Sequence, residues 1–142
     1  MKGRPSLVIK TSQIPKAGKG LYTTRKILKG EVIGEYTGKL LSTKVIDKDE
    51  DKYAENYYLF DIGNGVTIDG EKSKSKTRYI NDASGLTRIK GLSNNSSFHT
   101  YKRSNTVLLR AKRDIKPGEE IFASYGRDYW KAVKYNIENN LI

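Results

Sequence analysis

The sequence of 142 residues contains no cysteine. This absence excludes disulfide bonds and zinc sites built on thiolates, and it removes any redox clue to a cellular compartment. There is a single histidine, His99. Since no second histidine or cysteine accompanies it, we assign His99 no role as a ligand or base, and we expect no metal site.

Long apolar runs are also missing. No stretch approaches the roughly 20 apolar residues that a membrane-spanning helix needs. The basic start, MKGRPSLVIK, lacks the apolar segment of a secretory signal. We therefore expect a soluble, intracellular protein that makes no membrane contact.

Hydrophobic residues make up only 36% of the chain, whereas aromatic residues reach 10% and include ten tyrosines. The length fits one domain with a core of its own. We expect a single domain over residues 1–142, with a thin core and aromatic walls.

Acidic residues are the scarcer charged type, with 16 Asp and Glu against 27 Lys and Arg, a formal net charge of +11. Such a charge supports non-specific contact with nucleic acid, but it also suits a solvated, lysine-rich surface. Bulk charge does not decide between these interpretations.

Short β-type runs separated by Gly, Pro and Asn signals predict a mainly β, β-rich α+β fold. The expected strands cover residues 6–11, 21–27, 32–36, 57–62, 66–69, 106–111 and 121–124. Residues 42–56 are charged and lack alternation, which predicts an inserted helix. Helical spacing predicts a second helix over about 127–140. Residues 84–105 read as a long loop or extended hairpin.

Three separated segments carry the chemistry: AGKGLYTTRKILKGEVIGEYTG at 17–38, RYINDASG at 78–85 and RDIKPGEEIFASYGRDYW at 113–130. In this order they resemble the SET-domain protein lysine methyltransferases over most of residues 8–130. The resemblance implies a β-clip-like fold of short curved sheets with a knot-like C-terminal crossing. It also implies S-adenosyl-L-methionine as cofactor. Many family members carry flanking cysteine-rich zinc modules, which this chain cannot have.

The turn Gly18-Lys19-Gly20 is the first candidate for cofactor binding. Alone it reads as a tight turn, and it is too short for a dinucleotide or P-loop fingerprint. In the family a G-x-G at this place holds the cofactor through backbone groups. Asn81 matches the family's R-F-I-N-H segment and inherits a cofactor contact. Asp82 stands where the family has histidine, which leaves its contribution to cofactor affinity open.

Two tyrosines are the candidates for catalysis. By resemblance, Tyr36 of EYTG walls the channel for the substrate lysine, and Tyr125 ends the G-E-E-L-x-F-D-Y-like segment as the catalytic tyrosine. Each could instead be an ordinary tyrosine at a strand end. Glu119 and Glu120 lie too close on a strand, and point too far apart, to form an acid–base pair.

Further positions complete the expected site. The resemblance places Tyr58 and Trp130 near the cofactor, although Trp130 and Tyr129 would also suit a helix packed on the core. Ala123 stands where many members have a bulky aromatic residue. This favours more than one round of methylation, unless Tyr58 or Phe98 fills the space. Asn94-Asn95 is the candidate remnant of the family's P-N pair.

The resemblance implies an enzyme that methylates histone lysine in chromatin and is located in the nucleus. Two alternatives stay open, a methyltransferase for a non-histone protein and a catalytically idle SET-like module that binds chromatin or nucleic acid. The altered residues 82–85 keep the idle module open, whereas the joint retention of Tyr36, Asn81 and Tyr125 argues against it. A homodimer could complete the surface of so small a domain.

Overall fold

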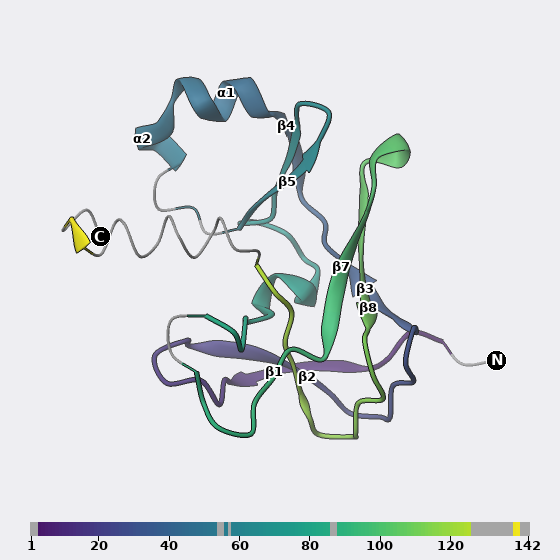
Figure 1. Ribbon diagram of the computed structural model, residues 1–142. Coiled ribbons are helices and arrows are strands. Elements are labelled where there is room, and N and C mark those ends of the chain that lie inside the picture. The colour runs from purple at the N-terminus through teal and green to yellow at the C-terminus, as the bar shows by residue number, and fades with distance from the viewer. Residues whose placement is uncertain (1–2, 54–55, 57, 86–87, 126–137, 140–142) are drawn as a thin grey trace.

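The computed structural model describes residues 3–53, 56, 58–85, 88–125 and 138–139. Three antiparallel, three-stranded sheets form the framework (Figure 1). The first sheet has the strand order β1-β2-β9, with bounds Leu7–Thr11, Lys19–Thr23 and Glu120–Ile121. The second has the order β3-β8-β7, with bounds Val32–Glu35, Thr106–Ala111 and Ser96–Tyr101. The third has the order β4-β6-β5, with bounds Lys39–Ser42, Val66–Asp69 and Leu59–Gly63.

The helices of the described residues are short. They are α1 at Thr43–Lys48, α2 at Glu50–Tyr53, and the 3-10 helices η1 at Lys76–Tyr79 and η2 at Lys102–Ser104. None of them has the length and apolar character to cross a membrane. Figure 1 shows α1 and α2 at the end of the molecule away from β1 and β2.

The inserted segment is two helices where the sequence predicts one. The helical path breaks at Asp49, whose φ of −134° is not helical. Neither helix has a buried residue, so packing against the sheets contributes little to holding the segment in one continuous helix. The C-terminal helix expected over 127–140 falls almost wholly outside the described residues.

The clearest strand in the sequence is also the most regular one in the structure. Burial alternates along β8 with a period of two, so Val107, Leu109 and Ala111 point into the core. The hairpin between β5 and β6 turns at Gly63, Asn64 and Gly65, which all have positive φ. The predictions for these strands are confirmed, whereas β4 was not predicted as a strand. Strand β7 lies within residues 84–105, for which the sequence left a long loop or an extended hairpin open.

Among the described residues, the core consists of two hydrophobic clusters joined by one aromatic side chain. The larger cluster lies among β2, β8 and β9 and includes Leu21, Leu109 and Ile121, each with no exposed surface. The smaller one contains Tyr36, Ile62, Ile68 and Val107. Phe98 of β7 packs against both clusters. Its ring centroid lies 5.9 Å from that of Tyr36 and 5.2 Å from that of Phe60, so the core has the aromatic wall that the composition predicts.

Residues 121–125 run between two segments that precede them in the chain. Phe122 forms a parallel bridge with Asn81, and Ala123 forms one with Ser96. The buried side chain of Asn95 reinforces this crossing, since it accepts from the Phe122 amide at 2.9 Å and donates to the Glu120 carbonyl at 2.9 Å. The crossing brings residues 121–125 beside residues 80–82.

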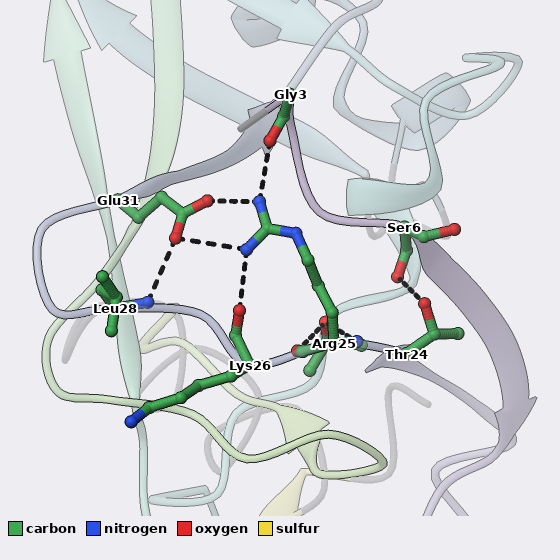
Figure 2. A network of polar contacts seen from close by, with 8 residues as sticks. Gly3, Ser6, Thr24, Arg25, Lys26, Leu28 and Glu31 are labelled. Carbon is green, nitrogen blue, oxygen red and sulfur yellow. Dashed lines mark hydrogen bonds and ion pairs between the residues drawn. The ribbon is translucent and has the colours of Figure 1, made fainter. Parts of the chain in front are cut away.

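A polar network around Arg25 and Glu31 holds the loop between β2 and β3. Figure 2 shows Arg25 donating to Glu31, to the carbonyl of Lys26 and to the carbonyl of Gly3. Glu31 in turn accepts from the Leu28 amide at 3.1 Å. This network ties the loop between β2 and β3 to the start of the chain.

Candidate functional site

A cavity of about 410 Å³ lies where the three sheets meet. Its walls come from the turn before β2, the end of β3, the start of β5, the segment from η1 to residue 81, strand β7, and Tyr125. The lining residues are Ala17, Gly18, Lys19, Tyr36, Tyr58, Leu59, Phe60, Arg78, Tyr79, Ile80, Asn81, Phe98 and Tyr125. The cavity therefore brings together residues from all three of the sequence segments singled out above.

The turn at residues 17–20 forms one wall through its backbone. Gly18 has a φ of +74°, a conformation that glycine adopts without strain, and its carbonyl accepts from the Ser12 amide at 2.8 Å. Gly18 and Lys19 line the cavity, but Gly20 does not. A Cβ on Gly20 would lie 2.2 Å from Oε2 of Glu120, so this glycine makes room for a buried carboxylate behind the turn.

Glu120 holds this turn against the last strand of the first sheet. Its side chain is fully buried, and its carboxylate accepts from the Ser12 hydroxyl at 2.6 Å, from the Gln13 amide at 2.8 Å and from the Tyr22 hydroxyl at 3.1 Å. Burial, followed by the charge of Glu120, raises the pKa of Tyr22 to about 12. Glu119 instead pairs with Arg113 at 2.7 Å on the outside of the molecule.

Asn81 connects the turn to the crossing. Its side-chain amide donates to the carbonyl of Lys19 at 2.9 Å, and its own carbonyl accepts from the Ala123 amide at 3.0 Å. The residue therefore stands between the glycine turn and the segment that carries Tyr125. This position leaves its carboxamide at the cavity wall.

Asp82 does not line the cavity, although the sequence places it among the cofactor-binding candidates. It is buried behind the wall, and its Oδ1 accepts from the amide and hydroxyl of Ser84 and from Asn94. Its Oδ2 accepts from the backbone amide of Tyr125 at 2.8 Å. Asp82 thus supports Tyr125 from behind.

The two catalytic candidates both lie in the cavity wall. The Tyr36 hydroxyl donates to the carbonyl of Tyr58 at 2.5 Å, and the Tyr125 hydroxyl donates to the carbonyl of Ile80 at 2.5 Å. Burial, followed by the charge of Asp69, raises the pKa of Tyr36, although the charge of Arg78 opposes the shift. Tyr36 is therefore a neutral phenol across the physiological pH range.

Several lining residues were not proposed from the sequence as ligand contacts. Arg78 was matched to the family segment without a role, while Phe60 and Ala17 were not singled out. Ala123 is fully buried in the larger cluster and does not line the cavity, whereas Tyr58 and Phe98 do. Because side chains alternate along a strand, the sequence could have placed Phe60 on one face of β5 and Phe98 on one face of β7. It could not have shown that both faces border a cavity.

The remaining candidates are not among the described residues that line the cavity. Trp130 and Tyr129 lie outside the described residues. His99 is exposed, with Nε2 lying 3.1 Å from the Ser97 hydroxyl. Asn94 and Asn95 pack against residues 82–84 and 120–122, which supports the crossing but does not test the suggested relation to a P-N pair. No group of three acidic, histidine or cysteine side chains among the described residues could hold a metal ion.

The family model of the SET domain matches residues 18–126, and the chain therefore belongs to the SET-domain family. Among its relatives is the histone-lysine N-methyltransferase EZH2 of Chaetomium thermophilum, which is 30% identical over 95% of this chain. An H3 lysine-4 specific histone-lysine N-methyltransferase of Cryptococcus neoformans is 31% identical over 76% of this chain. The chain spans 9% and 7% of the lengths of these two relatives.

Solved structures show the same fold. An active polycomb repressive complex 2 in the basal state matches with a TM-score of 0.71 and 29% identity, over 87% of this chain and 15% of the matched chain. The polycomb repressive complex 2 of Chaetomium thermophilum, in an autoinhibited conformation bound to S-adenosylmethionine, also matches. Its TM-score is 0.69 at 27% identity, over 95% of this chain and 17% of the matched chain. The mainly β SET-domain fold expected from the sequence is confirmed.

Proposed function

We propose that this chain is an S-adenosylmethionine-dependent protein-lysine N-methyltransferase. The observation that carries the proposal is the cavity, because it gathers Gly18, Tyr36, Asn81 and Tyr125 from separated segments of a SET-domain chain. Relatives that cover most of this chain are named histone-lysine N-methyltransferases.

The cavity fits a cofactor of this kind in size and chemistry. Its volume of about 410 Å³ is within the range of roughly 300–1,000 Å³ typical of small-molecule sites. The wall offers backbone groups at Gly18 and Lys19, the carboxamide of Asn81 and the ring of Tyr58. It also holds a buried donor without a partner, Nε of Arg78. These residues would hold the cofactor, and Trp130 is proposed to extend the site.

When bound, the cofactor supplies a methyl group carried on a sulfonium. The chain must then align a neutral lysine amine with it, and such alignment can account for several kcal/mol of rate acceleration, on the order of 5 or more. The hydroxyl of Tyr36 is engaged with the carbonyl of Tyr58, so its ring is the part left to wall the aliphatic stem of the lysine. Tyr125, held by Ile80 and Asp82, would orient the reacting groups.

The cavity also favours loss of a proton from the incoming amine. Free lysine has a pKa near about 10.4, and nearby positive charge and apolar walls lower that value. Among the described residues, the lining includes two cations, Lys19 and Arg78, and no carboxylate. We therefore assign no side chain as a strong base, and the cavity environment itself would favour the neutral amine.

The substrate that we propose is histone lysine within chromatin, with the nucleus as the place of action. The chain's net charge of +11 opposes direct docking on a basic histone tail but favours contact with nucleosomal DNA, from which a tail could be reached. A lysine on a non-histone protein is the alternative substrate.

Two measurements test the proposal. Calorimetric titration with S-adenosylhomocysteine should give saturable binding, whereas an idle module with no cofactor site would release no heat and show no thermal shift. Transfer of labelled methyl groups should then be followed on nucleosomes, free histones and a cell lysate, with mass spectrometry of the product. Methyl label that appears on nucleosomes before the other substrates supports chromatin as the substrate. Label confined to other proteins in the lysate supports the non-histone alternative. No label on any substrate contradicts the proposed enzyme activity.

A further inference from the structure

The positive charge of the chain is concentrated in one part of the sequence. Residues 83–113 contain seven Lys and Arg residues and no Asp or Glu, so they contribute +7 of the formal net charge of +11. Strands β7 and β8 and the 3-10 helix η2 between them all lie in this stretch. The hairpin that they form therefore carries basic residues and has no acidic residue of its own to neutralise them.

Two of these basic residues stand at the end of the hairpin, the β7–β8 tip (residues 101–105). Residues 99–104 are all exposed, and they include Lys102 and Arg103 of η2. Strand β3 pairs with β8 at residues 108–110, so the tip extends beyond the third strand of its sheet. Figure 1 shows the tip projecting away from β1 and β2. Both cations are thus presented to solvent.

Hydrogen bonds hold the backbone of the tip in one shape. Asn105 adopts a left-handed conformation with a φ of +52°, and its amide donates to the carbonyl of Lys102 at 3.3 Å. The hydroxyl of Ser104 donates to the carbonyl of Tyr101 at 3.4 Å. The stem of Lys102 packs over the turn between β5 and β6, where a Cβ on Gly63 would lie 2.9 Å from its Cε. Little backbone freedom is therefore lost when a ligand contacts the tip.

A third cation, Arg110, lies beside the tip on the outward face of β8. Its guanidinium donates to the carbonyl of Gly30 and to the hydroxyl of Tyr101, both at 3.2 Å. The ion pairs among the described residues involve none of Lys102, Arg103 and Arg110. A group of cations that the protein does not neutralise attracts a polyanion.

We propose that the β7–β8 tip, together with Arg110, contacts the phosphate backbone of duplex DNA. This inference rests on the proposed function and names the surface by which the enzyme approaches chromatin. Duplex DNA fits better than an acidic protein, because its phosphates are closely and evenly spaced. The tip also offers Lys, Arg, Ser, Asn and Tyr side chains, which are the usual donors to phosphate oxygens. Such contacts give affinity without reading the base sequence.

Strand β7 joins this surface to the cavity. Phe98 of β7 lines the cavity and lies four residues before Lys102 in the chain. A β-strand rises by about 3.3 Å per residue, so roughly 13 Å of strand separates the cavity wall from the tip. DNA bound at the tip would hold the cavity beside the duplex, within reach of a few residues of an extended protein tail.

Binding of a short fluorescent duplex, followed by anisotropy over a series of salt concentrations, tests the proposal. The double variant Lys102→Gln/Arg103→Gln should bind about 10- to 100-fold more weakly near about 0.1 M salt, because two phosphate contacts are lost. The slope of log K against log salt should become shallower by about 2. The swap Lys102→Arg/Arg103→Lys keeps both charges and should bind within about threefold of wild type.

The matched control is Lys44→Gln/Lys48→Gln, which removes two exposed cations from α1. It should bind the duplex within about threefold of wild type. Equal losses in the control and the tip variant would show a diffuse charge effect and overturn the assignment. A tip variant that binds free duplex like the wild type overturns it too, and so does a wild type that binds no duplex. Loss of nucleosome binding alone would point to an acidic protein surface instead.

Methyl transfer separates a failure of this proposal from a failure of the proposed function. The tip variant should methylate free histones at the wild-type rate but need a higher nucleosome concentration for its half-maximal rate. A wild type that methylates no substrate defeats the proposed function, whereas the duplex measurements still decide the role of the tip. Thermal unfolding checks that each variant is folded, and Arg103→Gln alone keeps the test decisive should the double variant not fold.

Discussion

Asp82 links the loop before β7 to the backbone of Tyr125 by hydrogen bonds. Its two carboxylate oxygens accept hydrogen bonds from different partners. Oδ1 accepts from Ser84 and Asn94, while Oδ2 accepts from the Tyr125 amide. The family places histidine here, so this arrangement belongs to the present chain. It makes Asp82 a positioning residue in our account, without contact to the cavity.

The two oxygens can be separated by mutation. In Asp82→Asn we expect the remaining oxygen to stay with Ser84 and Asn94, which turns an amide N–H towards the Tyr125 amide and breaks that contact. Turnover should fall while the affinity for S-adenosylhomocysteine changes little. Asp82→Ala removes both sets of contacts and should also lower the free energy of unfolding by about 1–3 kcal/mol. Steady-state kinetics and urea unfolding measure these effects, and wild-type turnover in Asp82→Asn would contradict the assignment.

Gly20 shows how strand β2 and strand β9 depend on each other. The pairing of Leu21 with Ile121 places Glu120 behind the glycine turn, where its carboxylate occupies the space that a Cβ of residue 20 would need. The turn can therefore keep its position only with glycine at residue 20. This is a packing requirement between two elements, since Gly20 itself does not line the cavity.

Gly20→Ala should lower the free energy of unfolding by about 1–3 kcal/mol, because the methyl group must displace the buried carboxylate or the turn. It should also weaken binding of S-adenosylhomocysteine, since the neighbouring Gly18 and Lys19 form the cavity wall. Gly3→Ala is the control, as nothing lies within 4 Å of a Cβ there. Thermal unfolding and calorimetry compare the two variants, and equal stabilities would show that Glu120 does not constrain the turn.

The elements differ in how far the sequence alone reveals them. Strand β8 could be predicted because TVLLRA is a short run of β-branched and leucine residues. Strand β7 could not, because SSFHTY carries little apolar alternation and pairs through its backbone with β8. Strand β4 is mostly exposed and depends on pairing with β6. Pairing partners far apart in the chain are not visible in a local pattern.

The same limit applies to the site. Tyr36, Asn81 and Tyr125 could be chosen from motifs, and the cavity brings them together. Asp82 was expected at the cofactor but lies behind the wall, because its carboxylate is used by Tyr125 and Asn94. The unpaired donor of Arg78 depends on where Tyr58, Tyr79 and Glu71 fall in space, and no sequence pattern contains that information.

At the scale of the whole molecule, the buried polar group at Tyr22 links stability to alkaline pH. Its pKa is raised in the folded protein from 10.0 to about 12, first by burial and then by Glu120. Between these values the folded chain keeps a proton that the unfolded chain has lost. Because the unfolded state binds fewer protons there, stability must fall as pH rises through this window.

Removing the hydroxyl should therefore flatten part of this dependence. Between pH 10 and about 12, the free energy of unfolding of Tyr22→Phe should decline less steeply than that of the wild type, although the variant is less stable at neutral pH. Urea unfolding at a series of pH values measures both slopes. The other tyrosines are common to the two proteins and cancel in the comparison. Identical slopes would show that the proton of Tyr22 is not retained on folding.

The central claim is that a methyl donor and a lysine amine meet beside one phenol in the cavity. The variant Tyr125→Phe tests this claim most directly. Labelled-methyl transfer to nucleosomes and binding of S-adenosylhomocysteine are measured on the same preparation. Tyr101→Phe, which changes an exposed tyrosine, is the control. We predict that the turnover of Tyr125→Phe falls by about 100-fold or more, while its affinity for the ligand stays within about threefold of wild type. Tyr101→Phe should keep the turnover of the wild type. Unchanged turnover in Tyr125→Phe would contradict the account.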